Sequence, residues 1–144
     1  MWSVKWFEWN GYKVEVDAEA TRGWYENAEP WGCTCGHCRN FLTAIDRLSG
    51  EMLGILKELS IPPEKTTDLS ELYHENGTLH YMASYRVVGR VLERPDETKW
   101  HGLACRDDPD SFYPYGAVGF PQPCFDLTFC PDLPWVLDEP LEGG

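Results

Sequence analysis

Three thiols lie within six residues, in the segment Cys33-Thr34-Cys35-Gly36-His37-Cys38. The Cys-x-x-Cys spacing of Cys35 and Cys38 lets two sulfurs converge on one point, and Gly36 eases the turn between them. Zn²⁺ binds thiolate sulfur at about 2.3 Å and usually takes four protein ligands in a structural site. We therefore predict a structural zinc site with Cys33, Cys35 and Cys38 among its ligands.

The fourth ligand stays open. His37 stands between two predicted ligands and is poorly placed to bind the same ion. His101 and Cys105, four residues apart, are candidates from a distant loop. Cys124 and Cys130 are predicted to be small buried residues, because free cysteine is among the most buried residue types. The same tendency keeps a second hypothesis open, a metal-free folded domain in which all the thiols are packed.

A third hypothesis concerns redox chemistry. Cys35-Gly36-His37-Cys38 resembles the active-site tetrapeptide of the protein disulfide isomerases, and Trp31 stands upstream. The resemblance implies a thiol-disulfide oxidoreductase in which Cys35 attacks and Cys38 resolves. Two departures count against it. Three residues separate Trp31 from the tetrapeptide, whereas the family has its Trp directly before the first Cys, and the preceding segment is not the buried parallel strand of a thioredoxin-like fold.

A longer resemblance starts from the pattern Cys-x-Cys-x-x-Cys-x-Asn-Phe, which ends at Asn40 and Phe41. An amphipathic pattern follows, then a strand with Tyr85 and Gly89, and finally Pro134-Trp135-Val136-Leu137. Together these features resemble a family of small, uncharacterised bacterial proteins. The resemblance implies a shared fold and a cytoplasmic location, and it carries no activity over to this chain.

The cysteines precede a segment with helical periodicity. Its apolar residues recur at steps of three and four, which places them on one core-facing stripe. They are Phe41, Ile45, Leu48, Met52, Ile55 or Leu56, and Leu59. Gly50 weakens the middle of the run without forbidding a helix there, and Pro62-Pro63 ends it. The pattern predicts one long or broken helix from about Arg39 to Leu59, with the cysteine loop at its N-terminal end.

Two Asn-Gly pairs predict tight turns, since both central residues of a type I′ turn need positive φ. The first, Asn10-Gly11, predicts a hairpin in which Glu8 lies opposite Lys13. After the second, Asn76-Gly77, apolar residues alternate with polar ones and predict a strand over residues 78–92. Gly89 within that strand indicates a bulge or a close backbone approach.

The remaining segments carry weaker signals. Residues 18–38 lack periodicity and are predicted to form a loop, and Asp68 with Glu71 resembles the capping box of a short second helix. Alternation over residues 124–129 predicts an edge strand, and residues 135–137 are predicted to add a terminal one. The expected fold is one α+β domain over residues 1–144. It has a mainly antiparallel sheet with the long or broken helix packed on one face.

The chain has 12 basic and 24 acidic side chains, a formal net charge of −12, and both halves are acidic. Such a surface repels phosphate, so neither nucleic acid nor an anionic membrane is expected as a partner. No window approaches the roughly 18 uninterrupted apolar residues of a membrane helix. Charges also arrive too early in the N-terminus for a signal peptide. We therefore expect a cytoplasmic protein, whose reducing surroundings keep thiols free or metal-bound.

The preferred hypothesis is a non-enzymatic binding or interaction module with a structural zinc ion and an unidentified protein partner. Four protein ligands would leave no open position for an activated water, which argues against catalysis at the metal. Oligomeric state does not follow from these patterns.

Overall fold

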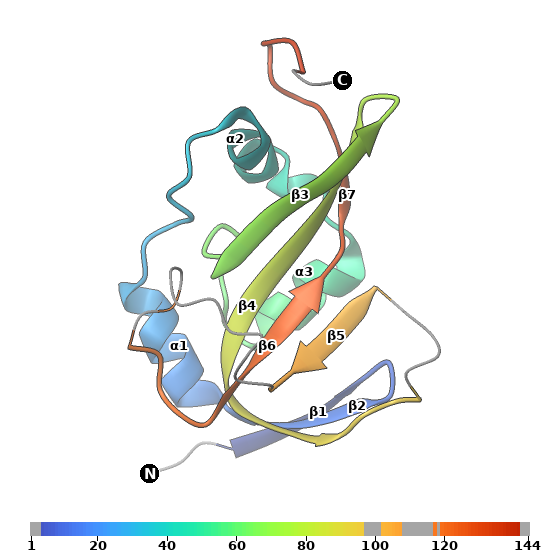
Figure 1. The fold of residues 1–144 in the computed structure, drawn as a ribbon. Helices are drawn as coiled ribbons and strands as arrows, with labels where there is room; N and C mark the ends of the chain where they lie inside the picture. The colour runs from blue at the N-terminus through green and yellow to red at the C-terminus, as the bar shows by residue number, and fades with distance from the viewer. Residues whose placement is uncertain (1–3, 97–101, 108–116, 118, 142–144) are drawn as a thin grey trace.

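The structure, a computed structural model, describes residues 4–96, 102–107, 117 and 119–141. Within them, seven strands form one sheet in the order β1-β2-β4-β6-β5, and β3 and β7 also pair with β4 (Figure 1). The strands are β1 (Val4–Trp9), β2 (Tyr12–Asp17), β3 (Asp68–Glu75), β4 (Thr78–Glu93), β5 (Leu103–Arg106), β6 (Cys124–Phe129) and β7 (Asp132–Pro134). All strand pairs in this part of the chain are antiparallel.

The predicted hairpin and long strand are confirmed. The strand at residues 124–129 forms, but the prediction that it is an edge strand was wrong, because β5 pairs with its outer side and leaves it buried between β4 and β5. Asn10 and Gly11 have φ of 49° and 88°, and Glu8 lies opposite Lys13 as expected. The strand predicted over residues 78–92 is β4, and the one predicted over residues 124–129 is β6. The terminal strand at residues 135–137 was wrong. The pairing with β4 ends at Pro134, opposite the first residue of β4, so the chain beyond it has no strand to pair with.

The long helix packed on the sheet was also wrong. The described part of the chain has three short α-helices instead, α1 (Ala18–Asn27), α2 (Gly36–Thr43) and α3 (Gly50–Glu58), with a 3₁₀ turn (Ile45–Arg47) between the last two. Leu48 is extended, with ψ of 153°, and the Ser49 side chain caps α3 by accepting a hydrogen bond from the Met52 backbone. Because a serine N-cap starts a new helix, the shared apolar stripe is divided between two helices.

Two further predictions were wrong because local signals were misread. Residues 18–27 form α1 rather than a loop. Asp17 caps this helix through the Ala20 backbone N–H, and Thr21 accepts a hydrogen bond from the Val88 backbone N–H of β4. Asp68 does not cap a helix. It begins β3, since pairing with β4 satisfies the backbone of this segment more completely than one helical turn would.

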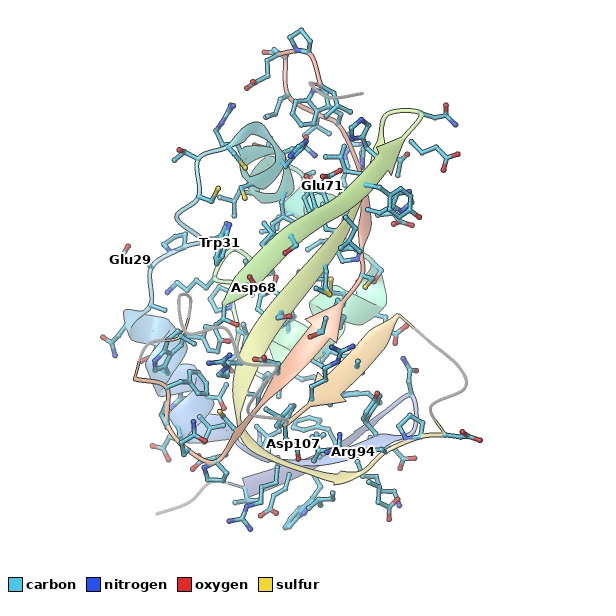
Figure 2. All side chains as sticks on the ribbon, viewed as in Figure 1. Glu29, Trp31, Asp68, Glu71, Arg94 and Asp107 are labelled. Atoms are coloured by element: carbon cyan, nitrogen blue, oxygen red, sulfur yellow. The ribbon has the colours of Figure 1, made fainter. Side chains whose placement is uncertain are left out.

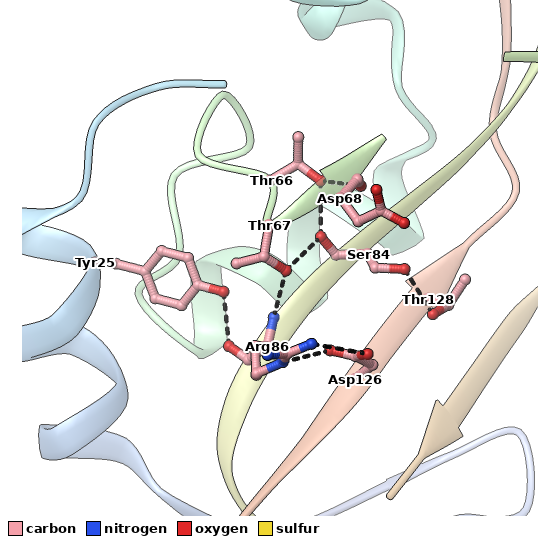
Figure 3. Close-up of polar contacts among 8 residues, drawn as sticks. All are labelled: Tyr25, Thr66, Thr67, Asp68, Ser84, Arg86, Asp126 and Thr128. Carbon is pink, nitrogen blue, oxygen red and sulfur yellow. Dashed lines mark hydrogen bonds and ion pairs between the residues drawn. The ribbon is translucent and has the colours of Figure 1, made fainter. Parts of the chain in front are cut away.

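The interior of the sheet contains a buried ion pair that joins β4 to β6 (Figure 3). Arg86 Nε donates to Asp126 Oδ1 at 2.9 Å, and both side chains are less than a tenth exposed. The Arg86 backbone N–H donates to Thr67 Oγ1, and its carbonyl accepts from the Tyr25 hydroxyl at 2.6 Å. The residue therefore ties α1, the segment before β3, β4 and β6 together.

Asp126→Asn is expected to lower the free energy of unfolding by about 3 kcal/mol, because it removes the carboxylate charge that pairs with the buried guanidinium. Urea unfolding followed by tryptophan fluorescence measures the loss as a lower midpoint at unchanged slope. Glu93→Gln is the control, since it breaks an exposed pair with Lys13 and should cost less than about 1 kcal/mol. Equal losses in the two variants would contradict the importance of the buried pair.

Gly89 marks the close approach of two backbones that the sequence indicated. Its φ is +155°, and a Cβ built on it would lie 2.0 Å from the Glu15 carbonyl oxygen of β2. No side chain fits there without moving β2 away from β4.

Gly89→Ala should destabilise the protein by about 3 kcal/mol, through the clash and the strained backbone together. Gly54→Ala is a matched control, because Gly54 lies inside α3 and a Cβ there meets nothing within 4 Å. That change should be neutral or stabilise by up to about 1 kcal/mol. Thermal unfolding of both variants tests the contrast, and a Gly89→Ala protein as stable as wild type would refute it.

Candidate metal centre

The predicted cysteine cluster lies where an irregular segment enters α2 (Figure 2). Cys35 is the N-cap residue, with extended φ and ψ of −65° and 162°, and no side chain caps the helix. Gly36 starts the helix, so Cys38 lies in its first turn.

The structure brings the three predicted ligands together. The Sγ atoms of Cys33, Cys35 and Cys38 all lie within 4.8 Å of one another. Sulfurs placed tetrahedrally at about 2.3 Å from one ion are roughly 3.8 Å apart, so a shift of about 1 Å or less closes the cluster. Cys33 and Cys35 are exposed and Cys38 is buried. This arrangement can hold a metal ion whose remaining position faces outward.

The surroundings shift the pKa values of Cys33 and Cys38 in opposite directions. The Cys35 backbone and then the Cys38 and Cys35 side chains hydrogen-bond to Cys33 and lower the pKa of its thiol. Burial raises the pKa of Cys38 to about 12, although the Trp31 indole N–H donates to its sulfur at 3.2 Å. A buried thiol of this kind becomes a thiolate readily only when a cation compensates the charge.

A buried asparagine holds α2 in place. Asn40 Nδ2 donates to the Pro134 carbonyl at 3.0 Å, and its Oδ1 accepts from the Val136 backbone N–H at 2.7 Å. The Tyr81 hydroxyl of β4 donates to the His37 carbonyl at 2.7 Å. The first turn of α2 is therefore fixed to β4 and to the segment that follows β7.

A cavity of about 340 Å³ borders the cluster. Its lining includes Cys35 and His37 from the start of α2 and Trp135 from the segment after β7. Arg39 and Glu139 form an ion pair at its wall, and Arg39 Nε also donates to the Thr34 carbonyl at 2.9 Å. The exposed Cys35 of the sulfur cluster thus faces a hollow with both polar and aromatic walls.

The described residues add no fourth ligand to the three sulfurs. Cys105 lies on β5, separated from β4 by β6, and burial raises the pKa of its thiol to about 12. His101 falls outside the described residues. Cys124 is buried on β6 as expected, whereas Cys130 is only partly buried.

His37 belongs to a different group. One ligand atom each from His37, Glu71 and His74 lie within 4.8 Å of one another. The sequence analysis missed this group, because it placed Asp68 and Glu71 at the start of a short helix and gave no sign that the segment lies close to His37. Even as a regular strand, the segment would direct residues 71 and 74 to opposite faces, so the spacing Glu-x-x-His did not indicate a shared site.

The redox resemblance gains no support from the fold, since the described strands pair only antiparallel and a thioredoxin-like sheet needs a parallel strand before the motif.

No family model, curated protein or solved structure matches this chain. The resemblance to small bacterial proteins therefore stays a prediction. Among the described residues, no helix has the length and apolar character needed to cross a bilayer.

In metal-free protein, Cys33 should be alkylated fastest of the three cluster thiols and Cys38 slowest. A lowered pKa gives Cys33 more thiolate at neutral pH, whereas the thiol of Cys38 ionises only towards pH 12. Iodoacetamide labelling at several pH values, followed by peptide mass spectrometry, measures each rate, with buried Cys105 as the slow reference. Fastest labelling at Cys35 would instead match the disulfide isomerase pattern.

Proposed function

We propose that this protein is a zinc-binding interaction module in which Cys33, Cys35 and Cys38 hold one Zn²⁺ as thiolates. The observation that carries the proposal is the convergence of the three sulfurs within 4.8 Å at the start of α2. Packed structural thiols have no reason to converge, and two of these three are exposed.

The ion would fix the segment between α1 and α2. Residues 28–35 contain no helix or strand, and Trp31 supplies a backbone contact by donating to the Glu64 carbonyl at 2.9 Å. A metal bound to Cys33 and Cys38 links this segment directly to the helix. Metal binding then stabilises the folded state, because the unfolded chain offers no preformed site.

The charge of the site favours a structural ion over a catalytic one. Three thiolates carry more negative charge than Zn²⁺ carries positive charge, so a water in the fourth position would lose a proton reluctantly. A water, or a side chain of the partner protein, would complete the coordination. A non-enzymatic protein of a reducing, cytoplasmic setting fits this chemistry, and the acidic surface disfavours nucleic acid as the partner.

Cys33→Ser should lower bound zinc by one equivalent per chain and reduce the melting temperature, because one of three protein ligands is lost. Protein is purified without chelator, and zinc is measured by elemental analysis beside a thermal unfolding curve. Cys130→Ser is the matched control, since Cys130 lies outside the cluster and should keep the metal.

Unchanged zinc content in Cys33→Ser would overturn the proposal. A second assay separates it from the oxidoreductase hypothesis, which predicts catalytic reduction of insulin disulfides by Cys35 and Cys38. The zinc module should show no turnover in that assay, and Cys33→Ser should not create any.

A further inference from the structure

We propose a second metal site in this protein, formed by His37 of α2 with Glu71 and His74 of β3, which takes a divalent transition-metal ion. These three side chains are partly buried, and their ligand atoms lie within 4.8 Å of one another. The site uses none of the three cysteines, so a test of this site does not depend on whether the cysteines bind zinc.

A β-bulge creates the pair on β3. Glu71 lies opposite Tyr81 and Tyr73 lies opposite His80, so Leu72 is the extra residue in β3. The bulge shifts the alternation of side chains by one position. His74 therefore lies opposite Leu79, and Glu71 and His74 point to the same side as the buried Leu79 and Tyr81.

The spacing of this pair is that of two ligands on one ion. His74 Nδ1 and Glu71 Oε1 are 3.4 Å apart, which is longer than the usual N–H···O hydrogen bond of about 2.9 Å. Nitrogen and oxygen ligands placed tetrahedrally at about 2.0–2.1 Å from an ion are roughly 3.4 Å apart. The side chains are 18% and 17% exposed, so they are shielded from most of the solvent.

His37 comes from the helix α2. Its ring lies 6.5 Å from that of His74 and packs edge-on against Trp135, with ring centroids 6.4 Å apart. The Tyr81 hydroxyl holds its carbonyl at 2.7 Å, and Tyr81 is the residue opposite Glu71. Tyr81 of β4 therefore connects the helix that carries His37 to the strand that carries Glu71 and His74.

Two imidazoles and one carboxylate select borderline ions such as Zn²⁺, Co²⁺ or Ni²⁺ over Mg²⁺ or Ca²⁺, which prefer oxygen ligands. Three protein ligands leave at least one coordination position for a water or an anionic ligand. The net charge of the loaded site is +1, in contrast to the anionic cysteine cluster. His37 also lines the cavity beside α2, so a ligand in that cavity would lie against one of the metal-binding residues.

Cobalt titration of the metal-free full chain distinguishes the two sites. Thiolate ligands give sulfur-to-cobalt charge-transfer absorption in the near ultraviolet, whereas a nitrogen and oxygen site gives only visible d–d bands. Wild-type protein should bind two equivalents of Co²⁺, one of them with charge transfer. Glu71→Gln and His74→Ala should each weaken the affinity for the second equivalent of Co²⁺, the one without charge transfer, by about 100-fold or more. Even changes in residues that only support a ligand lower metal affinity 10–100-fold.

His80→Ala is the control, because His80 lies on the adjacent strand β4, outside the proposed group, and should leave both equivalents bound. Glu71→Gln keeps the shape of the side chain, and far-UV circular dichroism verifies the fold of each variant. The second site would be overturned if both ligand variants still bound two equivalents of Co²⁺. It would also be overturned if wild type bound one equivalent and that equivalent showed charge transfer. Absence of charge transfer with variant-sensitive d–d binding would support it and would contradict the cysteine site instead.

Discussion

The architecture depends on the pairing of one strand, β4, with four others. Its first half lies between β3 and the strands β6 and β7, and its last residues pair with β2. At the middle of β4, Arg86 is buried and must be compensated by Asp126 of β6. A buried guanidinium tolerates few arrangements of its neighbours, and any register that separated it from Asp126 would break the buried ion pair. The ion pair therefore specifies how β4 and β6 align.

That alignment also positions both candidate metal groups. β4 presents Tyr81 to the first turn of α2, and Asn40 joins the same helix to the segment after β7. Cys33 and Cys35 are exposed where the irregular segment enters this turn, Cys38 is buried, and His37 lies close to Glu71 and His74 of β3. The start of a helix of eight residues thus contributes to two clusters of different chemistry, one of soft thiolates and one of imidazole and carboxylate.

Local patterns predicted those parts of the fold whose determinants lie within a few residues. The Asn10-Gly11 turn, the strand β4 and the close approach at Gly89 all appear as expected. The long helix failed at Leu48, where a serine cap interrupts a stripe that periodicity alone reads as continuous. The candidate capping box at Asp68 failed because a local signal for one helical turn competes poorly with a strand partner.

The sequence by itself indicated the cysteine group, because three thiols within six residues at a helix entry need only a local turn to bring their sulfurs together. Only the tertiary structure decided the grouping of His37 with Glu71 and His74, which are more than thirty residues away along the chain. That grouping needs the bulge at Leu72, the antiparallel pairing of β3 with β4 and the docking of α2 on β3. The physical reason is that side-chain direction on a strand depends on register, and register is set by distant partners rather than by neighbours in the sequence.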